Sequence, residues 1–161
     1  MHIAVIGAGR IGTAVADAAD QAGHDVRSLH SDTDTGVLHS FDLDLAVLAA
    51  AAEDSDKYES FEDFRSSLSW LGEVVGEDVP IASVSSLTLS QVQAVTGLRP
   101  TVRFMCSSAV PHPESLRFFD EAGDERAIKA LKQALPGPWR EVHREEFGRY
   151  TRLLIASALH C

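Results

Sequence analysis

The segment Gly7–Gly12 has the spacing G-x-G-x-x-G, which is typical of loops that bind the pyrophosphate of a dinucleotide. It follows an apolar run, His2–Ile6, and opens a stretch with helical periodicity, as this chemistry requires. In such a loop Gly7 permits a tight turn, Gly9 lets the backbone approach the phosphates, and Gly12 lets the helix pack close to the sheet. The helix N-terminus then offers free N–H groups and partial positive charge to an anion. The pattern therefore predicts a cofactor site formed by Gly7, Ala8, Gly9, Arg10, Ile11 and Gly12.

Residues within and just after the second expected strand, Asp25–His30, bear on the choice between NAD and NADP, and the sequence leaves both open. Asp32 lies 20 residues beyond Gly12, the usual position of an acidic side chain that binds the ribose hydroxyls of NAD. Arg27, His30 and Ser31 suit the 2′-phosphate of NADP instead. A solvated turn explains this polar stretch equally well.

Three candidate catalytic residues cluster where another strand, Thr101–Cys106, is expected to end, and a fourth follows shortly after. Open α/β sheets bind ligands at the carboxyl ends of their strands. Cys106 there is a candidate nucleophile with His112 as its base, although a small buried side chain is the alternative interpretation. Ser107 and Ser108 suit hydrogen bonding to a cofactor or substrate, since no G-x-S-x-G elbow surrounds them. The histidines have no metal-ligand spacing, so we expect no metal site.

Apolar runs alternate with helical patterns along the 161 residues, which is typical of an α/β domain with a mostly parallel sheet. We therefore expect a Rossmann-like, doubly wound fold. The expected strands are His2–Ile6, Asp25–His30, Leu43–Ala50, Pro80–Val84, Thr101–Cys106, Leu116–Phe119 and Trp139–His143. The expected helices are one between the glycine loop and Gly23, one over Glu59–Val75, one capped by Thr88 and Gln91 and ending at Gly97, and one capped by Asp124 and ending before Pro136.

The last segment, Glu146–Cys161, is apolar on several faces of a predicted helix. Such a helix needs cover on several faces, so it packs in this domain or against another chain. We divide the chain into a dinucleotide-binding domain, residues 1–145, and this C-terminal helix, residues 146–161, and expect a homodimer through the helix.

Composition excludes several classes of partner. With 24 acidic and 14 basic residues the net charge is −10, which disfavours nucleic acid and membrane surfaces. No apolar run is long enough to span a membrane. The N-terminus lacks the pattern of a secretory signal, and the two cysteines form no disulfide framework. We expect a cytoplasmic protein with a small-molecule substrate.

The middle of the chain resembles a known family. Pro80–Val92 reads PIASVSSLTLSQV, and Gly97–Met105 reads GLRPTVRFM. Together with the glycine loop these segments resemble the N-terminal domain of pyrroline-5-carboxylate reductases, whose cofactor domain is similar to that of deazaflavin-dependent NADP reductases. The resemblance implies that NADP or NAD binds with its nicotinamide beside a cyclic imine. It also implies that Ala49 and Ala50 line the cofactor and that Met105 through Ser108 lie near the nicotinamide.

The sequence departs from the family at three places. Ala51-Ala52 replaces a Lys-Pro pair, and Met105–Ala109 replaces Met-Pro-Asn-Thr-Pro. The sequence also stops where the family's helical dimerisation domain begins, so Glu146–Cys161 corresponds only to its first helix. We expect a small NAD(P)-dependent oxidoreductase that reduces an imine or carbonyl compound, in a site completed by a dimer partner. The alternatives are a non-redox protein on the same scaffold, such as a nucleotide sensor, a partner-binding module or a repurposed enzyme of specialised metabolism, and one subunit beside a separate helical protein.

Overall fold

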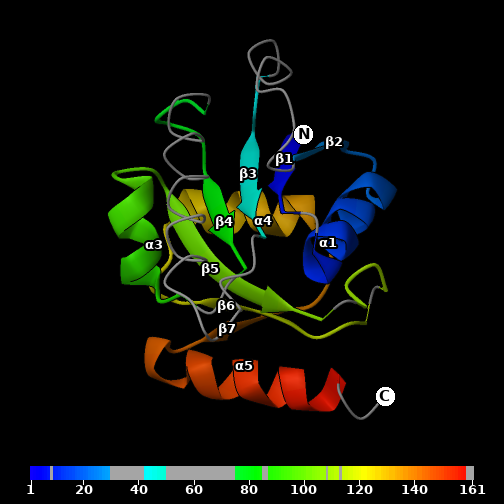
Figure 1. Cartoon of the computed structure of the whole chain (residues 1–161), viewed down its shortest axis with the longest axis vertical. Helices are drawn as coiled ribbons and strands as arrows, with labels where there is room; N and C mark the ends of the chain where they lie inside the picture. The colour runs from blue at the N-terminus through cyan, green and yellow to red at the C-terminus, as the bar shows by residue number, and fades with distance from the viewer. Residues whose placement is uncertain are drawn as a thin grey trace.

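A computed structural model describes residues 1–7, 9–29, 42–49, 75–84, 87–107, 109–112 and 114–158. In these residues one sheet runs in the order β2-β1-β3-β4-β5-β6-β7 (Figure 1). The strands β1 to β5 are parallel, β6 is antiparallel to β5, and β7 is parallel to β6. The strands are β1 (His2–Ile6), β2 (Asp25–Leu29), β3 (Leu45–Leu48), β4 (Ile81–Ser83), β5 (Thr101–Cys106), β6 (Arg117–Asp120) and β7 (Trp139–Val142).

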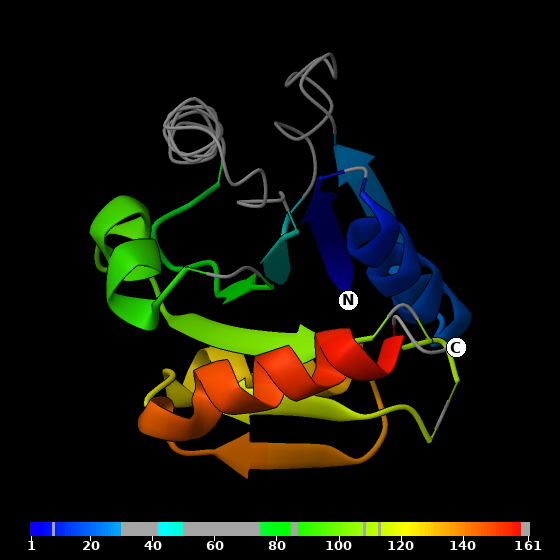
Figure 2. The same cartoon turned by 60° about the horizontal axis from the view of Figure 1, so that its bottom comes forward.

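Helices cover both faces of the sheet, and the buried apolar side chains of the described residues form two clusters. Ile3 and Val5 of β1 pack on the face that carries α1 and α4, whereas Ala4 and Ile6 pack on the other face with Val92 of α3. The last helix, α5, crosses the sheet on the side opposite α4 (Figure 2). This arrangement confirms the expected α/β, Rossmann-like fold class. The helices are α1 (Arg10–Gln21), α3 (Leu89–Thr96), α4 (Glu125–Ala134) and α5 (Arg144–Ala158).

The seven expected strands are all present, with their ends shifted by one or two residues at most. The β6 strand begins at Arg117 rather than Leu116 and includes Asp120, which the sequence analysis left out of the strand. Leu116 is 43% exposed, whereas Asp120 is fully buried in an ion pair. The helix expected over Glu59–Val75 lies outside the described residues, apart from Val75.

The helix ends follow the capping chemistry predicted from the sequence. The Thr88 hydroxyl accepts a hydrogen bond from the Gln91 N–H at 3.2 Å, and the Gln91 side chain accepts one from the Thr88 N–H at 2.9 Å. At the start of α4 the Asp124 carboxylate accepts hydrogen bonds from the N–H groups of Arg126 and Ala127. Each cap satisfies backbone donors that a helix cannot pair internally.

One face of α5 packs into this domain. Phe147 is 1% exposed, and its ring lies edge-on to Phe118 of β6, with 5.2 Å between the ring centres. Leu154 is also buried, whereas Leu153 is 59% exposed. The helix begins at Arg144, two residues before the expected start. A homodimer through α5 stays a prediction, as does the boundary after residue 145.

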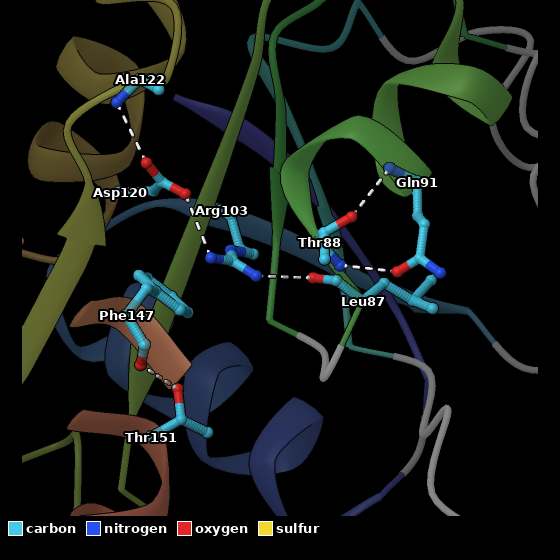
Figure 3. Close-up of polar contacts among 8 residues, drawn as sticks. All are labelled: Leu87, Thr88, Gln91, Arg103, Asp120, Ala122, Phe147 and Thr151. Carbon is cyan, nitrogen blue, oxygen red and sulfur yellow. Dashed lines mark hydrogen bonds and ion pairs between the residues drawn. The ribbon is translucent and has the colours of Figure 1, made fainter. Parts of the chain in front are cut away.

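A buried ion pair joins α5, the sheet and the start of α3 (Figure 3). Arg103 Nη2 lies 3.1 Å from Asp120 Oδ2, and Nη1 donates to the carbonyl of Leu87 at 3.1 Å. The guanidinium carbon lies 3.8 Å from the centre of the Phe147 ring. Asp120 Oδ1 accepts a hydrogen bond from the Ala122 N–H at 3.0 Å. Desolvation lowers the pKa of Arg103, while the charge of Asp120 and its hydrogen bond act in the opposite direction.

No helix among the described residues is both long and apolar enough to cross a membrane.

Replacing Asp120 by Asn tests how much this ion pair contributes to the free energy of unfolding. The variant Asp120→Asn keeps the side-chain shape but leaves the buried Arg103 charge without its counter-ion, so we expect a loss of about 3–5 kcal/mol in the free energy of unfolding. Urea denaturation measures this quantity. The control Asp25→Asn removes a carboxylate from a half-exposed pair with Arg27 at 3.9 Å and should cost less than about 1 kcal/mol. Equal losses in the two variants would contradict the assignment.

Candidate functional site

The turn after β1 and the start of α1 approach each other too closely for any side chain at Gly12. A Cβ atom at Gly12 would lie 2.2 Å from the carbonyl oxygen of Gly7 and 3.2 Å from Cβ of Ala49. Gly7 itself has a φ of 117°, in the left-handed region that favours glycine. Its N–H donates to the carbonyl of Leu29 at 3.1 Å, which fixes the turn against β2. These contacts bring the N-terminus of α1 directly onto the carboxyl end of β1.

The N-terminus of α1 carries no side-chain cap among the described residues. Gly9 is the N-cap residue, with φ −68° and ψ 174°, and no side chain in the described part of the chain accepts a hydrogen bond from the first turn of the helix. No atom of the described residues lies within 4 Å of a Cβ built on Gly9, and both Gly9 and Arg10 are exposed. The first N–H groups of a helix have no partner within it. This end of α1 is therefore open to an anion as far as the described part of the chain reaches.

The open helix end lies where the strand order reverses. The chain passes from β1 to β2 on one side, and then returns to β3 on the other side of β1. Ligands of open parallel sheets bind outside the carboxyl ends of the strands at such a reversal. Gly7 and Ala49 follow the two strands that flank this point, and the Ala49 N–H donates to the carbonyl of Ile6 at 2.7 Å.

The structure brings six of the predicted cofactor residues to this edge of the sheet: Gly7, Gly9, Arg10, Ile11, Gly12 and Ala49. Met105 lies further along the same edge, near the end of β5, and is largely buried. The other predicted cofactor residues, Ala8, His30, Ser31 and Ala50, lie outside the described residues, as does Asp32.

The structure buries the candidate nucleophile at the end of β5. Cys106 is 1% exposed, and burial raises the pKa of its thiol to about 12, with Arg117 acting in the opposite direction. Ser107 Oγ accepts a hydrogen bond from the Ala109 N–H at 3.2 Å, which holds it in the turn. His112 is exposed, and Ser108 lies outside the described residues. The geometry favours the alternative interpretation of Cys106 as a small buried side chain.

Two arginines in this half of the sheet were missed by the sequence analysis. Arg103 and Arg117 are 6% and 2% exposed, and their guanidinium groups make two and five hydrogen bonds, respectively. The available signal was a charged residue inside an otherwise apolar run, as in Leu116–Phe119. Among the described residues, no three His, Cys, Asp or Glu side chains are grouped so that they could hold a metal ion.

Solved structures of NAD(P)-dependent enzymes have a similar fold. The pyrroline carboxylate reductase of Plasmodium falciparum, with NADP bound, superposes at a TM-score of 0.76 over 99% of this chain, with 11% identity. Prephenate dehydrogenase of Aquifex aeolicus, in complex with NAD+, has a TM-score of 0.65 over 90% of the chain and 12% identity. An imine reductase of Streptomyces aurantiacus has a TM-score of 0.62 over 99% of the chain and 18% identity.

These likenesses are likenesses of fold. This chain spans 64%, 60% and 61% of the lengths of those three proteins, respectively. No protein-family model and no curated protein sequence matches the chain.

The burial of Cys106 predicts a thiol that is inert in the folded protein. With a pKa of about 12 the reactive thiolate makes up roughly one part in ten thousand at pH 8, and the fraction rises as pH increases toward that value. We expect iodoacetamide to alkylate Cys106 only after unfolding in urea, where the pKa returns to about 8.5. Peptide mass spectrometry after timed labelling measures the rate. Labelling of the folded protein at the rate of free glutathione would contradict this account.

Proposed function

We propose that the protein binds NADP or NAD and acts as a small oxidoreductase that reduces an imine or carbonyl substrate. The single observation that carries the proposal is the uncapped N-terminus of α1, held against the end of β1 by the contact between Gly12 and Gly7. An anion at this place is stabilised by free N–H groups and by the positive end of the helix dipole.

The residues present fit the pyrophosphate of such a cofactor. Gly12 supports the proposal because the loop has no room for a side chain there, and Gly9 supports it because space is open above its Cα atom. In our proposal the backbone N–H groups of Gly9, Arg10, Ile11 and Gly12 hold the diphosphate, and Ala8 completes the loop. The exposed Arg10 places a positive charge at this end of an otherwise acidic protein.

The remaining contacts of the cofactor are proposed from the predicted residues. We assign Ala49 and Ala50 to the wall beside the cofactor, and His30 and Ser31 to the ribose or its 2′-phosphate. Met105, near the end of β5, is assigned to the nicotinamide end. When bound, the nicotinamide supplies the hydride that reduces the substrate carbon. The task of this chain is then to bind the diphosphate, to orient the ring and to keep water from the reacting carbon.

The class of substrate and the partner belong to the same proposal. Reductases of pyrroline carboxylate and of imines have similar folds, which supports a carbon–nitrogen double bond as the reacting group. We propose a homodimer through α5, because Leu153 leaves an apolar side chain exposed on that helix. The proposal places the protein in the reducing cytoplasm, with no nucleic acid or membrane as partner.

A second candidate function is nucleotide binding without redox turnover. The observation that favours it is the state of the described residues at the end of β5: Cys106 is buried, and Ser107 Oγ accepts a hydrogen bond within a turn. A nucleotide sensor or a repurposed enzyme would keep the open helix end and need no such group.

Calorimetric titration with NADPH and NADH, followed by turnover assays on panels of cyclic imines and carbonyl compounds, separates these functions. The oxidoreductase proposal expects binding of at least one dinucleotide below millimolar concentration, and oxidation of the reduced cofactor by one class of substrate. Binding without any turnover favours the sensor. If neither NADPH nor NADH binds at millimolar concentration, both proposed functions are overturned.

Substitutions at Gly9 and Gly12 should both weaken dinucleotide binding but should change the free energy of unfolding in opposite directions. Gly9→Asp adds a good N-cap and a negative charge at the helix N-terminus, so we expect it to stabilise the free protein by up to about 1 kcal/mol. The same carboxylate competes for the N–H groups and repels a diphosphate, so dinucleotide affinity should fall at least about 100-fold, or roughly 2.7 kcal/mol.

Gly12→Ala should instead reduce both quantities, because its Cβ would overlap the Gly7 carbonyl and force the turn away from the helix; overpacking of this kind costs about 1–3 kcal/mol. Urea unfolding and calorimetry measure the two effects separately. A Gly9→Asp variant that binds dinucleotide as well as the parent protein would show that the phosphates bind elsewhere.

A further inference from the structure

Arg117, the first residue of β6, is a buried cation whose hydrogen-bond acceptors are almost all backbone carbonyls. Its five N–H donors face five acceptors. Nη2 donates to the carbonyls of Val110 at 2.6 Å and His112 at 3.2 Å, and Nε donates to Ser115 Oγ at 3.3 Å. Nη1 donates to the carbonyl of Leu135 at 3.0 Å and to that of Pro136. Arg117 as a whole residue is 2% exposed.

The charge of Arg117 is balanced by peptide dipoles. No carboxylate of the described residues lies within ion-pair distance of it, in contrast to the Arg103–Asp120 pair. Leu135 is the C-cap residue of α4, and the C-terminus of a helix is the negative end of its dipole. Four carbonyl oxygens and a helix end thus stand in for a counter-ion.

These hydrogen bonds tie together two chain segments that are far apart in sequence. Residues 109–112 belong to the connection between β5 and β6, and residues 135–137 follow α4. Gly137 fits against the guanidinium: it has a φ of 151°, and a Cβ there would lie 2.5 Å from Nη1. The connection after β5 is therefore fixed at its middle by a charged group from the following strand.

The connection between β5 and β6 that Arg117 holds lies at the same edge of the sheet as the open end of α1. Arg117 pairs with Cys106 across the antiparallel β5–β6 ladder, so it lies at the carboxyl end of β5. The carboxyl ends of β1, β3, β4 and β5 lie at one edge of the sheet, because these strands are parallel. The connection after β5 leaves this same edge, two strands beyond β3, whereas the open end of α1 lies beside β1. A dinucleotide bound by its diphosphate at α1 extends along the edge in one direction or the other.

We infer that Arg117 is a positioning residue, which fixes the β5–β6 connection as the wall against which the nicotinamide half of the dinucleotide and the substrate bind. This inference rests on the proposed function. It assigns to Arg117 no contact with cofactor or substrate. Its effect passes through the carbonyls of Val110 and His112, whose peptide groups it orients.

The inference predicts that altering Arg117 separates the two halves of the cofactor. The fragments ADP-ribose and 2′-phospho-ADP-ribose contain the diphosphate but lack the nicotinamide, so they reach the α1 site and not the end of β5. In Arg117→Lys the positive charge remains, but the planar set of five donors is lost. We expect this variant to bind the fragments within twofold of the parent protein and to bind NADPH or NADH about tenfold more weakly.

Hydrogen exchange in the free protein supplies a measurement that needs no cofactor. The N–H groups of Val110, His112 and Ser115 donate to carbonyls of the same connection at 3.1, 2.8 and 3.1 Å. In Arg117→Lys their exchange should accelerate at least tenfold, while exchange of the Thr13 N–H in α1 stays unchanged. The matched control Arg140→Lys, at an exposed position on β7, should leave exchange and all affinities unchanged.

Gly137→Ala is the second variant, for use if Arg117→Lys does not fold. Its Cβ would displace the guanidinium while Arg117 keeps its charge, so the same selective loss of dinucleotide affinity is expected. Equal weakening of fragment and dinucleotide, or faster exchange with unchanged dinucleotide affinity, would overturn the inference alone. Failure of the parent protein to bind both fragments and both dinucleotides would overturn the proposed function, and the inference with it.

Discussion

The candidate site depends on one steric constraint, which is that position 12 has room for glycine and for no larger residue. Because a Cβ there would lie 2.2 Å from the Gly7 carbonyl, only glycine lets α1 start directly at the end of β1. That closeness points the free N–H groups of the helix to the edge of the sheet, at the place where the strand order reverses. The position of the open helix end is thus a consequence of one steric fact.

Two buried guanidinium groups, on β5 and β6, hold this part of the sheet together, and their positive charges are balanced in different ways. Arg103 is paired with a carboxylate on the neighbouring strand and packs under Phe147, so it links α5 to the sheet. Arg117 is surrounded by carbonyls, so it orders connecting segments rather than whole elements. The ion pair contributes mainly to stability, whereas the carbonyl contacts hold the connection between β5 and β6, which we infer to be a wall of the proposed site.

The strands and caps were predictable because their causes are local in sequence. Apolar runs predicted both ends of β1 and of β5 correctly, and the spacing of Thr88 and Gln91 predicted the capping box. The glycine spacing likewise predicted the loop at Gly7 and Gly12. What was missed depends on contacts between distant residues: Asp120 pairs in register with Val142 of β7, and its buried carboxylate lies against Arg103, 17 positions earlier. The role of Arg117 depends on carbonyls from two separate segments, and a sequence pattern carries no record of such an arrangement.

The most direct test of the account is to observe the backbone amides at the start of α1 while a dinucleotide is added. In a 1H–15N NMR titration with NADPH and NADH, the resonances of Gly9, Arg10, Ile11 and Gly12 should show the largest shifts, with the Ala49 amide affected beside them. Amides on the outer strand β7 should not move. Saturating dinucleotide that shifts amides elsewhere and leaves residues 9–12 unchanged would contradict the claim that this helix end receives the diphosphate.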